Sequence, residues 1–247
     1  MEPIIEVKNL SKKYGKLLVL ENINFDIYRG EILCIVGGSG CGKSTLLRQI
    51  IGLESPTTGE IYVDGELYFP SNAKVQERIM KKFGVMFQLG GLLASMTLEE
   101  NIELPLKTYT SLSSNEIKEI IKIKLDAVGL DGFQDYLPSE ISGGMKKRAA
   151  LARAMALDPE ILFFDEPSSG LDPITSAALD NLIIELNKSL GTTMIIVTHD
   201  LASIYNVAHR IVMLDKSIKG VLAIGTPEEM KNSSNELIYN FFNRKFN

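Results

Sequence analysis

The chain has no tryptophan, two cysteines and two histidines among its 247 residues. It also has no apolar run near the roughly 18 residues that a membrane-spanning helix needs, and its start lacks the basic-then-apolar layout of a signal peptide. Cys34 and Cys41 fit no common zinc spacing, and an intracellular setting would disfavour a disulfide. The net charge of −5 argues against nucleic-acid binding. We therefore expect a soluble, unexported chain that would reach a membrane only through a partner.

Short apolar segments separated by helical patterns indicate strands of a parallel sheet. They are residues 32–36, 161–164, 194–197 and 211–214. Their continuous apolarity is typical of strands that helices cover on both faces.

Two other regions have patterns that differ from those of the parallel strands. The first seventy residues hold short, turn-punctuated segments typical of antiparallel strands, namely residues 4–7, 17–20, 23–27 and 60–63. Residues 89–157 are mainly helical in pattern. The predicted fold is therefore α/β: a parallel-sheet core with an N-terminal antiparallel β subdomain and a helical subdomain over about residues 89–157.

We expect one domain over residues 1–230 and a helical C-terminal tail over residues 231–247. Leu237, Ile238, Phe241 and Phe242 fall on one face of that tail helix. The tail either packs on its own domain or docks onto a partner protomer or an accessory subunit, and the sequence leaves both open.

Residues 37–44 match the phosphate-binding pattern GxxxxGK[ST] between an apolar strand and a helix. Glycines let backbone N–H groups turn toward a phosphate, and the helix N-terminus adds a favourable dipole. Lys43 would contact the β- and γ-phosphates of ATP, and the Ser44 hydroxyl would bind Mg²⁺. The expected nucleotide-binding residues are Gly37, Gly38, Ser39, Gly40, Cys41, Gly42, Lys43, Ser44 and Thr45.

Two acidic residues, Asp165 and Glu166, follow an apolar strand. The carboxyl end of a strand is where ligands bind in open α/β sheets, so Asp165 is predicted to lie beside the metal. Glu166 is then placed to polarise the attacking water. An isolated Asp-Glu pair would more simply be a solvated strand end, but a nearby phosphate loop favours the catalytic interpretation.

The segment Ile141-Ser142-Gly143-Gly144-Met145, with the stretch KKRAALARAMALDPE after Met145, resembles the signature motif of ABC ATPases. Ser142, Gly143 and Gly144 would offer an anion-binding helix start, although such a start is often an ordinary cap. Ile141 and Met145 depart from the usual leucine and glutamine. The resemblance runs from about residue 4 to residue 230 and implies a P-loop NTPase (RecA-like) fold.

Other ABC landmarks occur in the expected order. Tyr14 resembles the aromatic residue that stacks on adenine, and Gln88 the Q-loop glutamine that reaches the metal. Asp172 closes a D-loop-like segment and counts among the expected nucleotide-site residues. His199 matches the switch histidine at the γ-phosphate, whereas His209 has no such support. By resemblance, Glu166, His199 and Gln88 are catalytic, and Ser44, Gln88 and Asp165 hold the metal.

The resemblance also implies partners. Two copies would face each other, with Ser142–Gly144 of one copy covering the ATP bound by the other. The strings RAALARAMALDPE and DEPSSGLDPITS resemble the Mla/Mce-type lipid-transport branch. That branch implies phospholipid cargo, an integral-membrane permease, an Mce-type lipid-binding protein, a small STAS-type subunit, and a peripheral position on the cytoplasmic face of the inner membrane.

A set of apolar residues after Gln88 suits a docking surface for the permease, although ordinary subdomain packing would explain them equally: Leu89, Leu92, Leu93 and Met96. An amino-acid or methionine importer would share every catalytic motif. A non-transport ABC protein acting on DNA or ribosomes is the rival of another class, and the acidic balance and single ABC unit argue against it.

Overall fold

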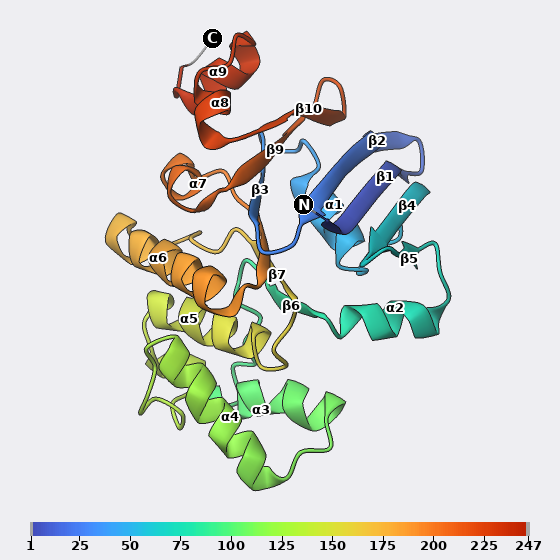
Figure 1. The fold of residues 1–247 in the computed structure, drawn as a ribbon. Helices are drawn as coiled ribbons and strands as arrows, with labels where there is room; N and C mark the ends of the chain where they lie inside the picture. Colours follow the sequence, from blue (N-terminus) through green and yellow to red (C-terminus); the bar gives the residue numbers. More distant parts are fainter. Residues whose placement is uncertain (1, 246–247) are drawn as a thin grey trace.

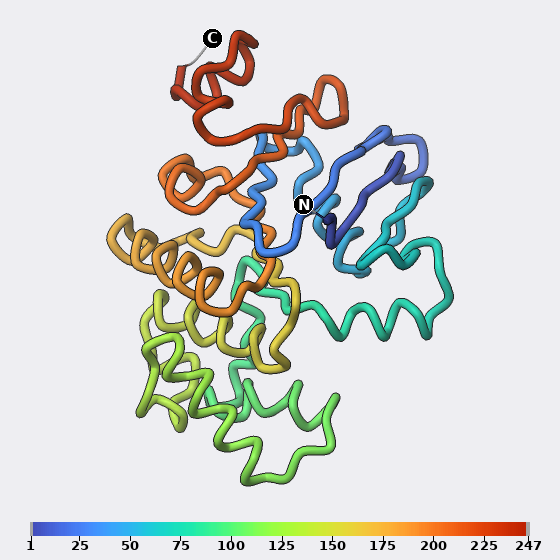
Figure 2. Tube along the Cα trace, viewed as in Figure 1, coloured from blue at the N-terminus to red at the C-terminus, as the bar shows by residue number. Residues whose placement is uncertain are grey.

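The computed structural model describes residues 2–245 and consists of two sheets and surrounding helices (Figures 1 and 2). Residue 1 of the predicted domain and residues 246–247 of the predicted tail lie outside the described residues. The strands are β1 (Pro3–Tyr14), β2 (Leu17–Tyr28), β3 (Ile32–Val36), β4 (Thr58–Val63), β5 (Glu66–Phe69), β6 (Phe83–Met86), β7 (Ile161–Asp165), β8 (Thr193–Val197), β9 (Arg210–Asp215) and β10 (Gly220–Gly225). The helices are α1 (Lys43–Ile50), α2 (Ala73–Met80), α3 (Leu98–Tyr109), α4 (Ser114–Ala127), the 3₁₀ turn η1 (Pro138–Glu140), α5 (Gly143–Ala154), α6 (Pro173–Leu190), α7 (Leu201–Val207), α8 (Pro227–Lys231) and α9 (Glu236–Phe242).

The larger sheet has the strand order β10-β9-β3-β8-β7-β6. Strands β9, β3, β8, β7 and β6 are parallel, and β10 is antiparallel to β9. The smaller sheet, in the order β2-β1-β4-β5, is antiparallel throughout. A parallel core with an N-terminal antiparallel sheet and a helical region is the predicted fold class. Figure 1 shows α3, α4 and α5 gathered on one side of the larger sheet and the smaller sheet on the other.

Strand β3 is buried on both faces, as its unbroken apolar sequence predicts. Leu33 and Ile35 belong to the hydrophobic cluster that includes α1 and the antiparallel sheet. Ile32, Cys34 and Val36 belong to the cluster beneath the helical region. β3 therefore separates the two cores. Burial raises the pKa of the Cys34 thiol, which keeps it protonated and unreactive.

The predicted break between residues 17–20 and 23–27 is wrong, because both segments lie in the single strand β2. Asn22 has a φ of 49°, and the pairing with β1 shifts register between Leu10 and Lys12. The polar residues that suggested a turn form an irregularity within a continuous strand, as β-bulges do.

The helical region begins later than predicted. Residue 89 lies in a loop, and α3 starts at Leu98 after a capping box made by Thr97 and Glu100. Asn101 is fully buried and holds that loop. Its Nδ2 donates to the carbonyls of Leu93, Met96 and Thr97, and its Oδ1 accepts from Leu93 N at 2.7 Å.

The C-terminal helices pack on their own chain. Ile238 and Phe242 of α9 are 5% and 3% exposed, and the Tyr205 hydroxyl of α7 donates to the Phe242 carbonyl at 2.8 Å. Leu237, predicted on the same apolar face, is 48% exposed. No helix within residues 2–245 combines the length and apolarity needed to cross a bilayer.

Asn101→Ala should lower the free energy of unfolding by about 2 kcal/mol, because it leaves buried backbone groups of the 93–97 loop without partners. Urea unfolding followed by circular dichroism measures this. Asn115→Ala, at an exposed position of α4, is the matched control and should be near neutral. Equal stability of the two variants would contradict the assigned role of Asn101.

Candidate functional site

The phosphate loop connects β3 to α1. Gly37 has a φ of 144°, and a Cβ there would lie 2.3 Å from the Leu214 carbonyl oxygen, so only glycine fits. A Cβ on Gly38 would meet nothing within 4 Å, which marks the open side of the loop. The N-cap residue of α1, Gly42, provides no side-chain cap, and the first turn of α1 has no acidic residue. These features leave the N-terminus of α1 suited to an anion.

Lys43, the first residue of α1, folds back over this loop. Its Nζ donates to the carbonyls of Gly37 at 2.9 Å and Gly38 at 3.1 Å. The cation is thereby held at the open side of the loop, where the β- and γ-phosphates of a nucleotide would lie.

Asp165 ends β7 next to the first turn of α1. Its Oδ1 is buried without a hydrogen-bond partner. Burial and the charge of Glu166 raise the pKa of Asp165, while a hydrogen bond with Ser44 lowers it. A buried carboxylate oxygen without a partner, beside a serine hydroxyl, is a donor set of hard oxygens that fits Mg²⁺. The residues present therefore fit the predicted metal.

Glu166 and His199 follow neighbouring strands and meet. Asp165 pairs in parallel with Val197, so β7 and β8 end together. His199 Nδ1 lies 2.8 Å from Glu166 Oε1. Glu166 has a φ of 49°, a left-handed conformation, and its N–H donates to the Val197 carbonyl at 2.8 Å. The Glu166 side chain is 14% exposed and that of His199 is 70% exposed, so the carboxylate is largely buried beneath a histidine that faces solvent.

Gln88 follows β6, the strand beside β7. Its Nε2 donates to Ser169 Oγ at 3.5 Å, and its main-chain carbonyl accepts from Lys147 Nζ at 2.6 Å. Gln88 is thus joined to the D-loop-like segment after Glu166. The described contacts of Gln88 do not include Asp165, so its predicted role at the metal stays a prediction.

Tyr14 lies at the other side of the phosphate loop. A hydrogen bond with Glu54 raises the pKa of Tyr14, and one with Thr45 lowers it, which places the phenol next to the residue after Ser44. The side chain is 44% exposed, and Lys12 Nζ lies 4.9 Å from the ring centroid. An exposed aromatic face beside the phosphate loop suits stacking on a base.

The predicted signature residues lie elsewhere. Ser142 caps α5, accepting from Met145 N at 3.3 Å. A Cβ on Gly144 would lie 2.5 Å from Thr175 of α6, so Gly144 allows these two helices to pack closely. Asp172 caps α6 by accepting from Thr175 N at 3.0 Å. Figure 1 draws α1 beside the antiparallel sheet and apart from α5 and α6.

Sequence reasoning missed Lys147 and Arg153. Lys147 is 8% exposed, and Arg153 donates to the Gly91 carbonyl. Burial lowers the pKa of each side chain. The sequence offers no signal for their burial, because burial of a lysine or an arginine depends on the tertiary neighbours of the helix.

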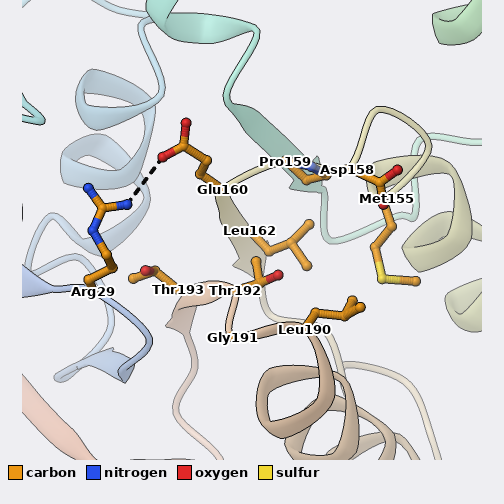
Figure 3. Close-up of a pocket in the computed structure, with 10 residues that line it drawn as sticks. All are labelled: Arg29, Met155, Asp158, Pro159, Glu160, Leu162, Leu190, Gly191, Thr192 and Thr193. Atoms are coloured by element: carbon orange, nitrogen blue, oxygen red, sulfur yellow. Dashed lines mark hydrogen bonds and ion pairs between the residues drawn. The ribbon is translucent and has the colours of Figure 1, made fainter.

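A separate cavity of about 300 Å³ lies at the opposite, amino ends of β7 and β8 (Figure 3). Figure 3 shows Arg29 paired with Glu160, with Nη1 and Oε2 3.2 Å apart. Ligands of open α/β sheets bind beyond the carboxyl ends of strands, so this cavity is not the nucleotide site.

The sequence family described as "ABC transporter" matches residues 20–169, more than half of the chain. The chain belongs to the ABC transporter family. The matched segment contains the phosphate loop, Ser142–Gly144 and the carboxylates that end β7. This ABC subunit is therefore an ATPase that binds ATP, as its sequence predicted.

Curated relatives match over almost the whole chain. The chain is 40% identical to the intermembrane phospholipid transport system ATP-binding protein MlaF of Haemophilus influenzae, covering 96% of this chain and 89% of that protein. It is 40% identical to MlaF of Escherichia coli over 87% of this chain and 80% of that protein. It is also 41% identical to the probable ribonucleotide transport ATP-binding protein mkl of Mycobacterium leprae, covering 97% of this chain and 68% of that protein.

Solved ABC structures share the fold. The cbiO1 subunit of Clostridium perfringens, part of the ABC transporter complex cbiONQ, aligns with a TM-score of 0.84 at 29% identity, over 93% of this chain and 90% of that one. A dimeric ATP-binding cassette in a post-hydrolysis state, bound to ADP and Pi, aligns with a TM-score of 0.81 at 33% identity, over 90% and 98%. The predicted ABC ATPase fold is confirmed.

Asp165→Asn should raise the free energy of unfolding without nucleotide by on the order of 1 kcal/mol, because it removes a buried charge. The same variant should lose Mg²⁺-dependent ATP hydrolysis. Urea unfolding and phosphate release measure the two effects, with Asp131→Asn at an exposed position as control. A destabilised Asp165→Asn would contradict the cost assigned to this carboxylate.

Proposed function

We propose that this ABC ATPase powers phospholipid transport as a dimer bound to an integral-membrane permease. The observation that carries the catalytic part is the contact of 2.8 Å between Glu166 and His199, beside Asp165 and the phosphate loop. The observation that carries the cargo is the 40% identity to MlaF over 96% of the chain.

The nucleotide is bound at the phosphate loop. Tyr14 stacks on the base, the loop amides of residues 37–45 surround the phosphates, and Lys43 neutralises charge on the β- and γ-phosphates. Ser44 and Asp165 hold Mg²⁺, with Gln88 as a further oxygen donor. Mg²⁺ supplies charge neutralisation on the phosphate oxygens during transfer.

Glu166 acts on the attacking water. Phosphoryl transfer depends mostly on positioning and charge neutralisation, so a carboxylate held in one orientation is suited to orient the water and accept its proton. His199 fixes that orientation through its contact with Oε1 of Glu166. From its exposed position, the other ring edge of His199 contacts the γ-phosphate.

A second copy completes each site. The N-terminus of α5, with Ser142 as its cap, is an anion-binding feature, and Figure 1 draws α5 apart from α1. We infer that Ser142, Gly143 and Gly144 cover the ATP held by the partner's phosphate loop, with Asp172 nearby. The dimeric cassette that shares this fold supports the arrangement.

Glu166→Gln should keep ATP binding and lose at least about two orders of magnitude in turnover, because it removes the base. It should also accumulate as a dimer with ATP and not with ADP, since the γ-phosphate is retained. Phosphate release and light scattering measure these outcomes. Glu185→Gln, at an exposed position of α6, should behave as wild type. Turnover of Glu166→Gln near that of the wild type would remove Glu166 from the mechanism.

A groove of about 690 Å³ beside the Gln88 loop supports a permease partner. Its walls come from α2, β6, α3 and α5, and include Met80, Phe87, Tyr109 and Arg153. Leu89, next to the groove, is 95% exposed, and Leu93 is 41% exposed. An apolar groove with exposed leucines at its edge suits an amphipathic helix of the permease.

The remaining parts of the proposal rest on the relatives. MlaF is named for intermembrane phospholipid transport and mkl for ribonucleotide transport. We take phospholipid as the cargo, with an Mce-type lipid-binding protein, a STAS-type small subunit and a position on the cytoplasmic face of the inner membrane.

Met80→Glu should prevent recovery of the permease and lipid with the tagged ATPase, because it places a carboxylate where the permease would bury it against apolar side chains. Ile123→Glu, on the exposed face of α4, should recover both. Mass spectrometry of the solubilised complex identifies the permease and the cargo. Nucleotides or amino acids in place of phospholipid, with the permease retained, would overturn the cargo assignment.

A further inference from the structure

One face of α5 holds the loop that carries Gln88. Along this face, Lys147, Ala150 and Arg153 follow one another at three-residue intervals. Lys147 Nζ donates to the Gln88 carbonyl at 2.6 Å, and Arg153 donates to the Gly91 carbonyl. Two cationic side chains from one helix therefore hold the two ends of a short loop.

Between these ends the loop lies directly on the helix. Gly90 has a φ of 80°, and a Cβ built on it would lie 3.3 Å from the Cβ of Ala150, which is 2% exposed. A small residue on each side permits this approach. The loop over residues 88–91 is thus fixed to α5 at three successive points.

A lysine is an unusual residue at a nearly buried contact with a backbone carbonyl. Lys147 is 8% exposed, and it pairs with a backbone carbonyl rather than with a carboxylate. Nearly buried charges are rare unless they are paired, because their desolvation is costly. The nearby charge that favours the ammonium is that of Glu166, which raises its pKa against the lowering effect of burial. A leucine or methionine would fill the same space at less cost.

The position of Lys147 connects groups that serve two different nucleotides. Ser142, the N-cap of α5, precedes Lys147 by little more than one turn. Lys147 itself donates to the Gln88 carbonyl. The Gln88 side chain in turn donates to Ser169, which follows Glu166 in the chain. In the proposed dimer, Ser142 covers the partner's ATP, while Gln88 and Glu166 serve the ATP of their own chain.

We propose that Lys147 is a positioning residue that couples the helix bearing Ser142 to the Gln88 loop, so that both ATP sites of the dimer are assembled together. This inference rests on the proposed dimer and on the assignment of Glu166. Arg153, at the other end of the same face, lines the permease groove and extends this connection to the membrane partner.

The first test compares Lys147→Met with Lys147→Arg in the permease-bound complex. Lys147→Met should lower kcat about tenfold with unchanged ATP affinity of the isolated subunit, because the phosphate loop is untouched. Lys147→Arg should restore most of kcat, since it keeps a cationic donor. Lys124→Met is the matched control. Lys124 is also 8% exposed, but its ammonium pairs with Asp158 and not with the Gln88 loop. Its kcat should be normal, because its side chain does not contact the Gln88 loop.

The second test adds Lys147→Met to Glu166→Gln and measures the dimer formed with ATP. The double variant should bind ATP as Glu166→Gln does but form clearly less dimer, because Ser142 is no longer held in register with Gln88. If Lys147→Met does not fold, Lys147→Gln replaces it, since its shorter side chain also cannot span to the Gln88 carbonyl.

These outcomes distinguish failure of the proposed function from failure of the role assigned to Lys147. Absence of an ATP-dependent dimer in Glu166→Gln itself would overturn the proposed function. A normal dimer in Glu166→Gln together with an equal dimer in the double variant would overturn only the role of Lys147. The role of Lys147 would also be overturned if Lys147→Met had the kcat of the wild type. It would be overturned as well if Lys147→Met and Lys147→Arg lowered kcat equally.

Discussion

The parallel pairing of β7 with β8 determines where the proposed catalytic residues of this ABC ATPase lie. Because Asp165 pairs with Val197, the residues that follow these two strands emerge at the same edge. Glu166 and His199 meet there at 2.8 Å without any side chain reaching across the sheet. β3 is parallel to β8 and delivers the phosphate loop to the same edge. A shift in register between these strands would separate the carboxylates from the lysine even if every residue were retained.

Charge that is costly to bury is concentrated around this edge. Asp165 has a buried oxygen without a partner, and Lys147 and Arg153 lose hydration on their contact with the Gln88 loop. Such groups lower the stability of the protein without its ligands, and a ligand that pairs with them would stabilise the folded chain.

Much of this arrangement could be predicted from sequence because glycines and strand ends carry strong local signals. The phosphate loop, the Asp165 strand and the parallel core all follow from patterns within a few residues. β5, β6 and β10 were missed. For β5 a signal existed, because Asp64-Gly65, both with positive φ, form a turn pair typical of hairpins. Lys147 and Leu237 could not be assigned, because burial of a lysine and exposure of a leucine depend on tertiary neighbours rather than on periodicity. The separation of α5 from α1 likewise depends on topology.

The backbone conformation of Glu166 lowers the stability of the fold. A left-handed conformation costs a residue other than glycine roughly 1 kcal/mol, and Glu166 adopts it at a φ of 49°. Glycine would relax the turn, and asparagine would tolerate it, but neither carries the carboxylate that the proposed mechanism requires. Substitutions of Glu166 that stabilise the fold are therefore expected to abolish the proposed activity, so selection for thermostability alone would act against catalysis at this residue.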